Sequence, residues 1–157
     1  MTGAAIEIAD LRFAHGEQPV LAGVTLRVAP GEIYGVVGAD GAGKTTLLQL
    51  AVGQLPPRDG RITVLGRDAA DPALRDEIAY MPQGFGLYPD LSVRENLDFF
   101  ADLHGLSRTV ARERIVELLR RTGLAGFEDR RTRNLSGGMM QKLALACALV
   151  SQPRAMF

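Results

Sequence analysis

The chain has 157 residues, of which 46% are hydrophobic and 23% are charged, which is typical of one soluble globular domain with a buried core. Its formal net charge is zero, so nothing indicates a nucleic acid or an anionic membrane surface as a partner. The longest apolar run is too short for a membrane span and the N-terminus has no secretory pattern, so we expect a cytoplasmic protein. Cys147 is the only cysteine, so we expect a buried structural thiol and no internal disulfide.

The first part of the chain has the pattern of an antiparallel β element. Residues 6–13 alternate apolar and polar side chains and predict a strand. A turn at residues 15–19 separates them from a second predicted strand at residues 20–28, and Pro30-Gly31 marks the next turn. Residues 33–37 are a short apolar run, Ile-Tyr-Gly-Val-Val, which predicts a buried strand.

A glycine-rich loop follows this run directly. It reads Gly38-Ala39-Asp40-Gly41-Ala42-Gly43-Lys44-Thr45-Thr46 and fits G-x-x-x-x-G-K-[ST], the loop that binds phosphate. Residues 45–52 predict the helix that this motif requires after its strand. The glycines allow successive N–H groups to turn toward phosphate oxygens, and the helix N-terminus adds partial positive charge. We expect Lys44 to place a cation near the terminal phosphates and the Thr45 hydroxyl to bind Mg²⁺.

The next segment is mixed in structure. Residues 53–60 form a predicted loop, residues 61–65 a strand, residues 71–76 at most a short helix, and residues 78–81 another strand. Gln83 comes just after this last strand. A glutamine at a strand end near a nucleotide can ligate Mg²⁺ or hold a water through its carbonyl oxygen. A solvated loop glutamine is the alternative interpretation.

The chain then becomes helical. Ser92 and Glu95 have the spacing of a capping box at the start of a helix that Gly105 ends. Ser107 caps a second helix that runs to about residue 122, where Gly123 stops it. The predicted apolar stripes of the two helices consist of Val93, Leu97, Phe100 and Leu103, and of Val110, Ile115, Leu118 and Leu119.

Arginines are frequent around the second helix. They alternate with acidic residues, so we interpret this region as a solvated face, with a contact to a partner or to lipid headgroups as the alternative. The arginines are Arg108, Arg112, Arg114, Arg120, Arg121, Arg130, Arg131 and Arg133.

A second helix start with glycines lies in Leu135-Ser136-Gly137-Gly138-Met139. Ser136 is a natural N-cap, and Gly137 and Gly138 leave the first amides of the helix accessible at the positive end of its dipole. We therefore expect a second phosphate-binding position here, and an ordinary capped helix is the alternative. This helix is predicted to continue through residue 150, and residues 155–157 are predicted to begin a core strand.

The order of these motifs resembles the nucleotide-binding domain of ABC transporters over essentially the whole chain. Met139 stands where the family usually has Gln. This variant is most similar to ATPases of ABC-2-type and multidrug exporters, as is the sequence after Gln83, which reads Gly84-Phe85-Gly86-Leu87-Tyr88-Pro89. The resemblance implies an α/β fold: a P-loop NTPase core of the RecA-like class with an N-terminal antiparallel β element and a helical insertion, incomplete at the C-terminus. It divides the domain into a core at residues 1–88, a helical subdomain at 89–134, and the signature helix with the next strand at 135–157.

The resemblance also implies how ATP and Mg²⁺ would be bound. Lys44 and Gln83 would be catalytic residues, with Thr45 and Gln83 binding the metal and Gln83 sensing the γ-phosphate. Ser136, Gly137 and Gly138 would contact the γ-phosphate of ATP held by a second subunit, so that ATP closes a head-to-tail dimer.

Two further contacts follow from the resemblance. His15 falls at the position of the family's adenine-stacking aromatic residue, with Phe13 as the alternative platform and a solvated turn histidine as the other interpretation. Residues 83–88, with Phe85 and Tyr88, would meet an integral membrane permease. The protein would then lie peripherally on the inner face of the cell membrane.

The family's catalytic acids are expected beyond the segment present here. In the family, the strand that begins at residues 155–157 ends in a Mg²⁺-binding Asp and a catalytic Glu, and a switch His follows. We therefore expect the complete protein to couple ATP hydrolysis to export, and the 157-residue chain to bind nucleotide weakly and hydrolyse it negligibly. The alternatives are a soluble ABC-type ATPase of DNA repair or translation, a P-loop kinase for small molecules, and a non-catalytic nucleotide-binding fragment.

Overall fold

The computed structural model describes residues 3–157. Within these residues the chain forms two compact units, one made of the residues up to Arg75 together with Phe157, the other of Asp76–Met156. The division of the domain at residues 88 and 134 stays a prediction. None of the helices in residues 3–157 has both the length and the apolar character needed to cross a membrane.

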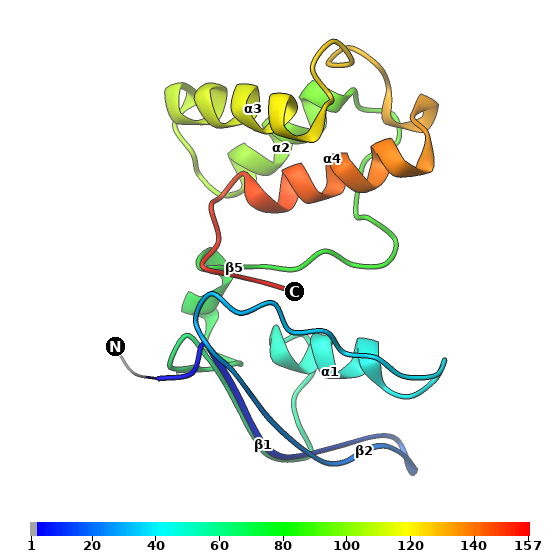
Figure 1. Ribbon diagram of the computed structural model, residues 1–157, viewed down its shortest axis with the longest axis vertical. Coiled ribbons are helices and arrows are strands. Elements are labelled where there is room, and N and C mark those ends of the chain that lie inside the picture. The colour runs from blue at the N-terminus through cyan, green and yellow to red at the C-terminus, as the bar shows by residue number, and fades with distance from the viewer. Residues whose placement is uncertain (1–2) are drawn as a thin grey trace. The chain divides into compact units, whose positions relative to one another are not determined.

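A four-stranded antiparallel sheet is the main element of the first unit, with the strand order β2-β1-β3-β4. Strands β1 (Ile6–His15) and β2 (Gln18–Val28) form a hairpin, seen side by side in Figure 1. Strand β3 (Asp59–Val64) pairs with the other side of β1, and the short β4 (Arg67–Asp68) pairs with β3. The strands predicted from alternation at residues 6–13, 20–28 and 61–65 are therefore confirmed, within a few residues at their ends.

Helix α1 (Lys44–Ala51) contacts β3 and completes the first unit. Its buried residues are Thr46, Leu47, Leu50 and Ala51. The apolar side chains of the sheet that are buried in this unit are Ile8, Leu11, Leu21, Val28, Ile62 and Val64. The predicted helix after the glycine-rich loop is thus present, and it begins one residue earlier than predicted.

The predicted buried strand at residues 33–37 is wrong in this structure. These residues form no strand, and Ile33 and Val37 are 99% and 96% exposed. A strand requires a second backbone to exchange hydrogen bonds with, and none of the strands in residues 3–157 pairs with this segment. The apolar run indicates a β-prone sequence, but burial depends on neighbours that a local pattern does not report.

Helices α2 (Val93–Leu103), α3 (Arg108–Thr122) and α4 (Gly137–Leu149) form most of the second unit. The short parallel strands β5 (Ile78–Ala79) and β6 (Ala155–Met156) pair with each other, so the strands predicted at residues 78–81 and 155–157 are present but shorter than predicted. Two 3-10 helices, η1 (Pro72–Asp76) and η2 (Thr132–Asn134), lie in the connecting segments. The predicted caps are present, because the serine before each of α2, α3 and α4 accepts a hydrogen bond from a backbone N–H of the first turn.

The capping box of α2 is complete. The Ser92 hydroxyl accepts from the Glu95 N–H at 3.1 Å, and the Glu95 carboxylate accepts from the Ser92 N–H at 2.7 Å. The backbone and side-chain hydrogen bonds from Ser92 lower the pKa of Glu95 below its ordinary value. Gly123 ends α3 with a φ of 68°, in the left-handed region that favours glycine.

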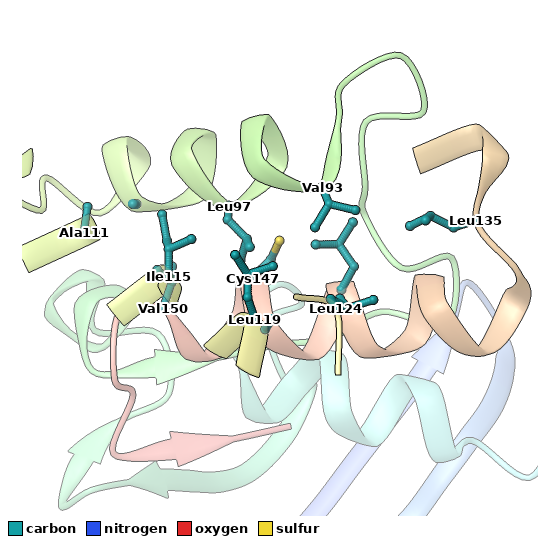
Figure 2. Close-up of a cluster of buried hydrophobic side chains, with 12 residues drawn as sticks. Val93, Leu97, Ala111, Ile115, Leu119, Leu124, Leu135, Cys147 and Val150 are labelled. Atoms are coloured by element: carbon teal, nitrogen blue, oxygen red, sulfur yellow. The ribbon is translucent and has the colours of Figure 1, made fainter. Parts of the chain in front are cut away.

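A cluster of buried apolar side chains joins the three helices of the second unit. Figure 2 shows Leu97 of α2 and Cys147 of α4 pointing toward each other. Cys147 is 2% exposed, and burial raises the pKa of its thiol to about 12, so it is a structural thiol as predicted. The cluster comprises Val93, Leu97, Ala101, Ala111, Ile115, Leu119, Leu124, Leu135, Leu143, Ala146, Cys147 and Val150.

The predicted apolar stripes are wrong at two positions near helix ends. Leu103, the last residue of α2, is 66% exposed, and Val110, near the start of α3, is 36% exposed. Both keep the correct helical spacing, but the helix ends lie beyond the buried cluster, so spacing alone does not bury them.

Candidate functional site

The phosphate loop (residues 38–46) is exposed over its first half, at residues 38–42. The Ala42 N–H donates to the Ala39 carbonyl at 3.2 Å, and the Leu47 N–H donates to the Gly43 carbonyl at 2.8 Å, where α1 begins. Gly41 and Gly43 have φ values of 79° and 86°. Only glycine adopts such values at little cost, which explains Gly43, the second glycine of the motif, and the further glycine at position 41.

Gly43 also packs closely against β2. A Cβ atom added to Gly43 would lie 3.0 Å from side-chain atoms of both Val20 and Leu21. The loop therefore approaches the hairpin so closely at position 43 that a side chain there would require Val20 or Leu21 to move.

Helix α1 begins without a side-chain cap, in contrast to α2, α3 and α4. Its N-cap residue is Gly43, which makes no capping hydrogen bond through a side chain, whereas a serine hydroxyl caps each of the other three α-helices. The first N–H groups of α1 therefore have no side-chain acceptor, and they carry the positive end of the helix dipole. A helix start of this kind is suited to bind an anion such as phosphate.

The ammonium group of Lys44 lies over the same loop. Its Nζ donates to the carbonyl oxygens of Gly38 and Ala39, both at 2.7 Å. Because an ammonium group has three N–H donors, one donor remains for a phosphate oxygen. The loop thus holds a full positive charge beside its open amides.

Thr45 is the residue of the loop that suits a magnesium ion. Its side chain is exposed at the first turn of α1. In residues 3–157 no group of three or more His, Cys, Asp and Glu side chains could hold a metal ion. Mg²⁺ commonly takes one or two protein oxygens and completes its shell with substrate phosphates and waters, and the Thr45 hydroxyl fits that mode of binding.

His15 lies at the end of the hairpin that packs against the loop. Its exposed ring meets the half-buried ring of Phe13 edge to face, with 5.0 Å between centroids and an angle of 87°. Phe13 pairs in register with Leu21, and the Leu21 side chain is one of the two groups that contact the Gly43 position. The end of β1 is therefore near the phosphate loop, whereas adenine stacking by His15 stays a prediction.

Gln83 belongs to the second unit and is exposed. The chain turns sharply after it, since the Phe85 N–H donates to the Pro82 carbonyl at 3.0 Å and Phe85 has a φ of 62°. A positive φ is uncommon for a residue with a bulky side chain and marks a special conformation. The roles predicted for Gln83 in metal binding and catalysis stay predictions.

A partly exposed aromatic cluster lies near this turn. It consists of Tyr88, Phe99 and Phe100, and the ring centroids are 4.6 Å apart for Tyr88–Phe99 and 5.5 Å apart for Phe99–Phe100. Tyr88 is 46% exposed and Phe99 is 38% exposed. Sequence reasoning missed Phe99, although a phenylalanine outside the apolar stripe of α2 is a signal of a contact surface.

The N-terminus of α4 is open as well. The Ser136 hydroxyl accepts from the Met139 N–H at 3.3 Å, and its own proton remains available for an acceptor. Gly137 and Gly138 are exposed, and a Cβ added to either would meet nothing within 4 Å. Neither glycine therefore blocks an anion that approaches the first amides of the helix. The predicted phosphate contact stays a prediction.

Comparison with known proteins gives one consistent result. The family model described as ABC transporter matches residues 21–157. The chain is 44% identical over 147 residues to a probable multidrug ABC transporter ATP-binding protein, YbhF, of Escherichia coli, and covers 25% of that protein with 92% of its own length. It is 39% identical over 159 residues to the daunorubicin resistance ATP-binding protein DrrA3 of Streptomyces coeruleorubidus, covering half of it with 100% of its own length.

A solved structure described as the ATP binding subunit of an ABC transporter is also similar. It is 34% identical to this chain, with a TM-score of 0.84, and the match covers 95% of this chain and 63% of the other. The chain therefore spans a quarter to about two thirds of the lengths of these proteins. The predicted α/β fold of a P-loop ATPase is confirmed.

Proposed function

Because the chain belongs to the ABC transporter family of ATP-binding domains, we propose that it is the nucleotide-binding part of an ATPase that drives an exporter. The observation that carries this proposal is the geometry of the phosphate loop. Helix α1 starts there without a side-chain cap, and the ammonium group of Lys44 donates to two carbonyl oxygens of the loop. Both features suit a polyphosphate. The export direction is supported by the two relatives described above, a probable multidrug transporter protein and a daunorubicin resistance protein.

Positioning and charge neutralisation are the main tasks of such a site. The open amides of the phosphate loop would donate hydrogen bonds to the β- and γ-phosphates, and Lys44 would compensate their charge with its remaining N–H donor. The Thr45 hydroxyl would hold Mg²⁺, which would supply further neutralisation of the phosphates. The His15 ring, supported by Phe13, would stack on the adenine.

A preference for triphosphate over monophosphate tests this proposal on the 157-residue chain. A fluorescent ATP analogue is bound to the purified chain and displaced by unlabelled nucleotides in the presence of Mg²⁺. We expect ATP to compete at least tenfold better than AMP, since only the longer phosphate chain reaches the Lys44 donor. Equal competition by AMP would remove the basis for a triphosphate site.

The second half of the site is proposed to come from another subunit. Ser136, Gly137 and Gly138 form an exposed helix start without blocking side chains, and they would contact the γ-phosphate of ATP held by the partner. ATP would then act as the link in a head-to-tail dimer. A soluble ABC-type ATPase would share this arrangement but would need no membrane permease.

Disulfide formation between introduced cysteines tests the dimer. Ala42 in the loop and Ser136 are both exposed, so we predict that the variant Ala42→Cys with Ser136→Cys forms a cross-linked dimer under mild oxidation when MgATP is present, and not without nucleotide. The native Cys147 does not interfere, because its thiol is 2% exposed and its pKa is raised to about 12.

A matched control uses the other exposed serine cap of the second unit. The pair Ala42→Cys with Ser107→Cys should not form an ATP-dependent dimer on a non-reducing gel, although Ser107 also precedes a helix and is exposed. Cross-linking of both pairs to the same extent, or cross-linking that does not depend on ATP, would contradict an ATP site shared between two subunits.

The aromatic cluster is the proposed contact for the membrane permease. Tyr88 and Phe99 expose apolar rings beside the turn that follows Gln83, as expected for a surface that a partner covers. A permease bound there would hold the protein at the inner face of the cell membrane, where cytoplasmic ATP is available. Transport and hydrolysis would be activities of the whole protein.

A further inference from the structure

The side chain of Asn96 is fully buried in the second unit and has no role in the proposed site. It is 0% exposed and lies on the inner face of α2, between Val93 and Leu97. Its Oδ1 accepts from the Tyr88 N–H at 2.9 Å. Since a backbone N–H can only donate, this contact fixes which atom of the amide is the oxygen.

The amide nitrogen of Asn96 donates to acceptors in two segments of the chain. Its Nδ2 is 3.1 Å from the Tyr88 carbonyl, 3.0 Å from the Ser92 carbonyl and 2.9 Å from Oγ1 of Thr132. Thr132 is itself 2% exposed. One buried side chain therefore joins the segment at residues 88–92 to the segment at residues 130–133.

These two segments, which we call the loop pair, also bond directly to each other. Asp90 and Arg133 form an ion pair at 2.9 Å on their exposed side, and Ser92 and Arg131 form an isolated antiparallel bridge. The backbone bonds run from the Val93 N–H to the Arg130 carbonyl at 3.0 Å, from the Thr132 N–H to the Leu91 carbonyl at 2.9 Å, and from the Arg133 N–H to the Pro89 carbonyl at 3.0 Å.

The two ends of the loop pair lead to two different functional surfaces. Tyr88, at one end, belongs to the aromatic cluster. At the other end the Leu135 N–H donates to the Thr132 carbonyl at 3.0 Å, and Ser136 follows as the cap of α4. The buried bond between Asn96 and Thr132 therefore lies between the aromatic cluster and the open N-terminus of α4.

We propose that Asn96 and Thr132 are positioning residues that couple the aromatic cluster to the start of α4. The proposal rests on the proposed function, in which a permease covers the cluster and Ser136 contacts nucleotide. A displacement of the Tyr88 backbone must either break buried hydrogen bonds, which leaves unsatisfied polar groups, or carry Thr132 with it. The second outcome is favoured because it keeps the buried hydrogen bonds. A displacement of Tyr88 by a bound permease therefore moves Thr132 and, with it, Ser136.

Amide hydrogen exchange of the 157-residue chain, without nucleotide, tests the coupling. Thr132→Val keeps the shape of the side chain and removes only the acceptor for Asn96, whereas Thr132→Ser keeps the hydroxyl. We expect Thr132→Val to raise the exchange rates of the Tyr88 and Met139 amides about fivefold, the ratio that corresponds to one lost hydrogen bond. Thr132→Ser should restore the wild-type rates.

The control is Thr122→Val, the same chemical change in α3. Thr122 is half-buried, and its hydroxyl donates to the Leu118 carbonyl at 2.7 Å, within one helix. This variant should leave the Tyr88 and Met139 amides unchanged. An equal rise at all amides of the second unit in Thr132→Val would indicate a merely structural role and overturn the proposal.

A second variant keeps the test decisive if Thr132→Val does not fold. Tyr88→Ala removes an exposed ring and leaves Thr132 and its bond to Asn96 unchanged, so it should raise exchange at Met139 severalfold, and leave the Val110 amide at the start of α3 unchanged. An unchanged Met139 amide in Tyr88→Ala, or an equal rise at Met139 and Val110, would overturn the coupling. Since no nucleotide is present, a failure of ATP binding leaves this result unaffected, and the two proposals fail separately.

Discussion

Replacement of Lys44 by alanine is expected to weaken ATP binding to this chain by about 10- to 100-fold. The remaining N–H donor of Nζ would make a hydrogen bond between two charged groups with the terminal phosphates, and such bonds contribute about 1.5–3 kcal/mol. The variant also loses the bonds from Nζ to the Gly38 and Ala39 carbonyls, which hold the charge over the loop. Isothermal titration with ATP and Mg²⁺ measures the loss.

The chain offers a matched control for this variant. Lys142 is the only other lysine among the 18 lysines and arginines, and it is exposed on α4 in the second unit. Lys142→Ala removes the same charge and should leave the dissociation constant of ATP within about twofold of the wild-type value, as for a solvent-screened surface charge that is not part of the phosphate loop. An equal loss in both variants would mean that net charge, rather than the phosphate loop, governs binding.

Replacement of Ile115 by alanine is expected to destabilise the second unit by about 2–5 kcal/mol. Ile115 is 0% exposed and belongs to the buried cluster that joins α2, α3 and α4. The substitution removes buried methyl groups and leaves a cavity, and both effects lower the free energy of unfolding. Urea unfolding followed by the circular dichroism of the helices measures this change.

The neighbouring residue in α3 provides the control for Ile115. Val116 is 55% exposed, so Val116→Ala makes a comparable loss of side-chain volume on the outer face of the same helix. Its effect on the free energy of unfolding should stay within about 0.5 kcal/mol. Similar destabilisation by both variants would show that the cluster in Figure 2 does not hold the helices together.

Features that depend on a few adjacent residues could be predicted from the sequence. The serine caps at positions 92, 107 and 136 and the glycine stop at position 123 depend on local hydrogen bonds and local backbone angles, so the residue types indicate them. The hairpin strands β1 and β2 follow from alternation and a turn. The phosphate loop is also local, because its glycines and Lys44 act through neighbouring backbone groups.

Features that depend on distant parts of the chain were not predicted. The apolar run at residues 33–37 has no partner strand within the part of the chain that the structure describes, and its local sequence carries no information about that. Leu103 keeps the helical spacing but lies beyond the contact between helices. Asn96 could have been noticed as a polar residue on the apolar face of α2, but its bond to Thr132 joins residues 36 positions apart.

At the candidate site, too, local features could be predicted from the sequence and long-range contacts could not. Residues 38–46 were identified together because they are contiguous, and their geometry in the structure suits phosphate binding. Phe99 was missed because its contact with Tyr88 joins a loop to a helix face. The predicted cooperation of Gln83 and Ser136 with the phosphate loop depends on arrangements between units and between subunits, which a single pattern in the sequence does not contain.

The most direct test of the ATP site is a nuclear magnetic resonance titration of the ¹⁵N-labelled chain with ATP and Mg²⁺. Amide resonances report changes at each N–H group, so they locate the ligand within the sequence. If the phosphate loop holds the triphosphate, the largest shifts occur at the amides of Gly41, Gly43, Lys44, Thr45 and Thr46, and AMP produces much smaller ones. Saturation with ATP that leaves these five amides unchanged, or that moves only resonances outside residues 38–46, would contradict the account.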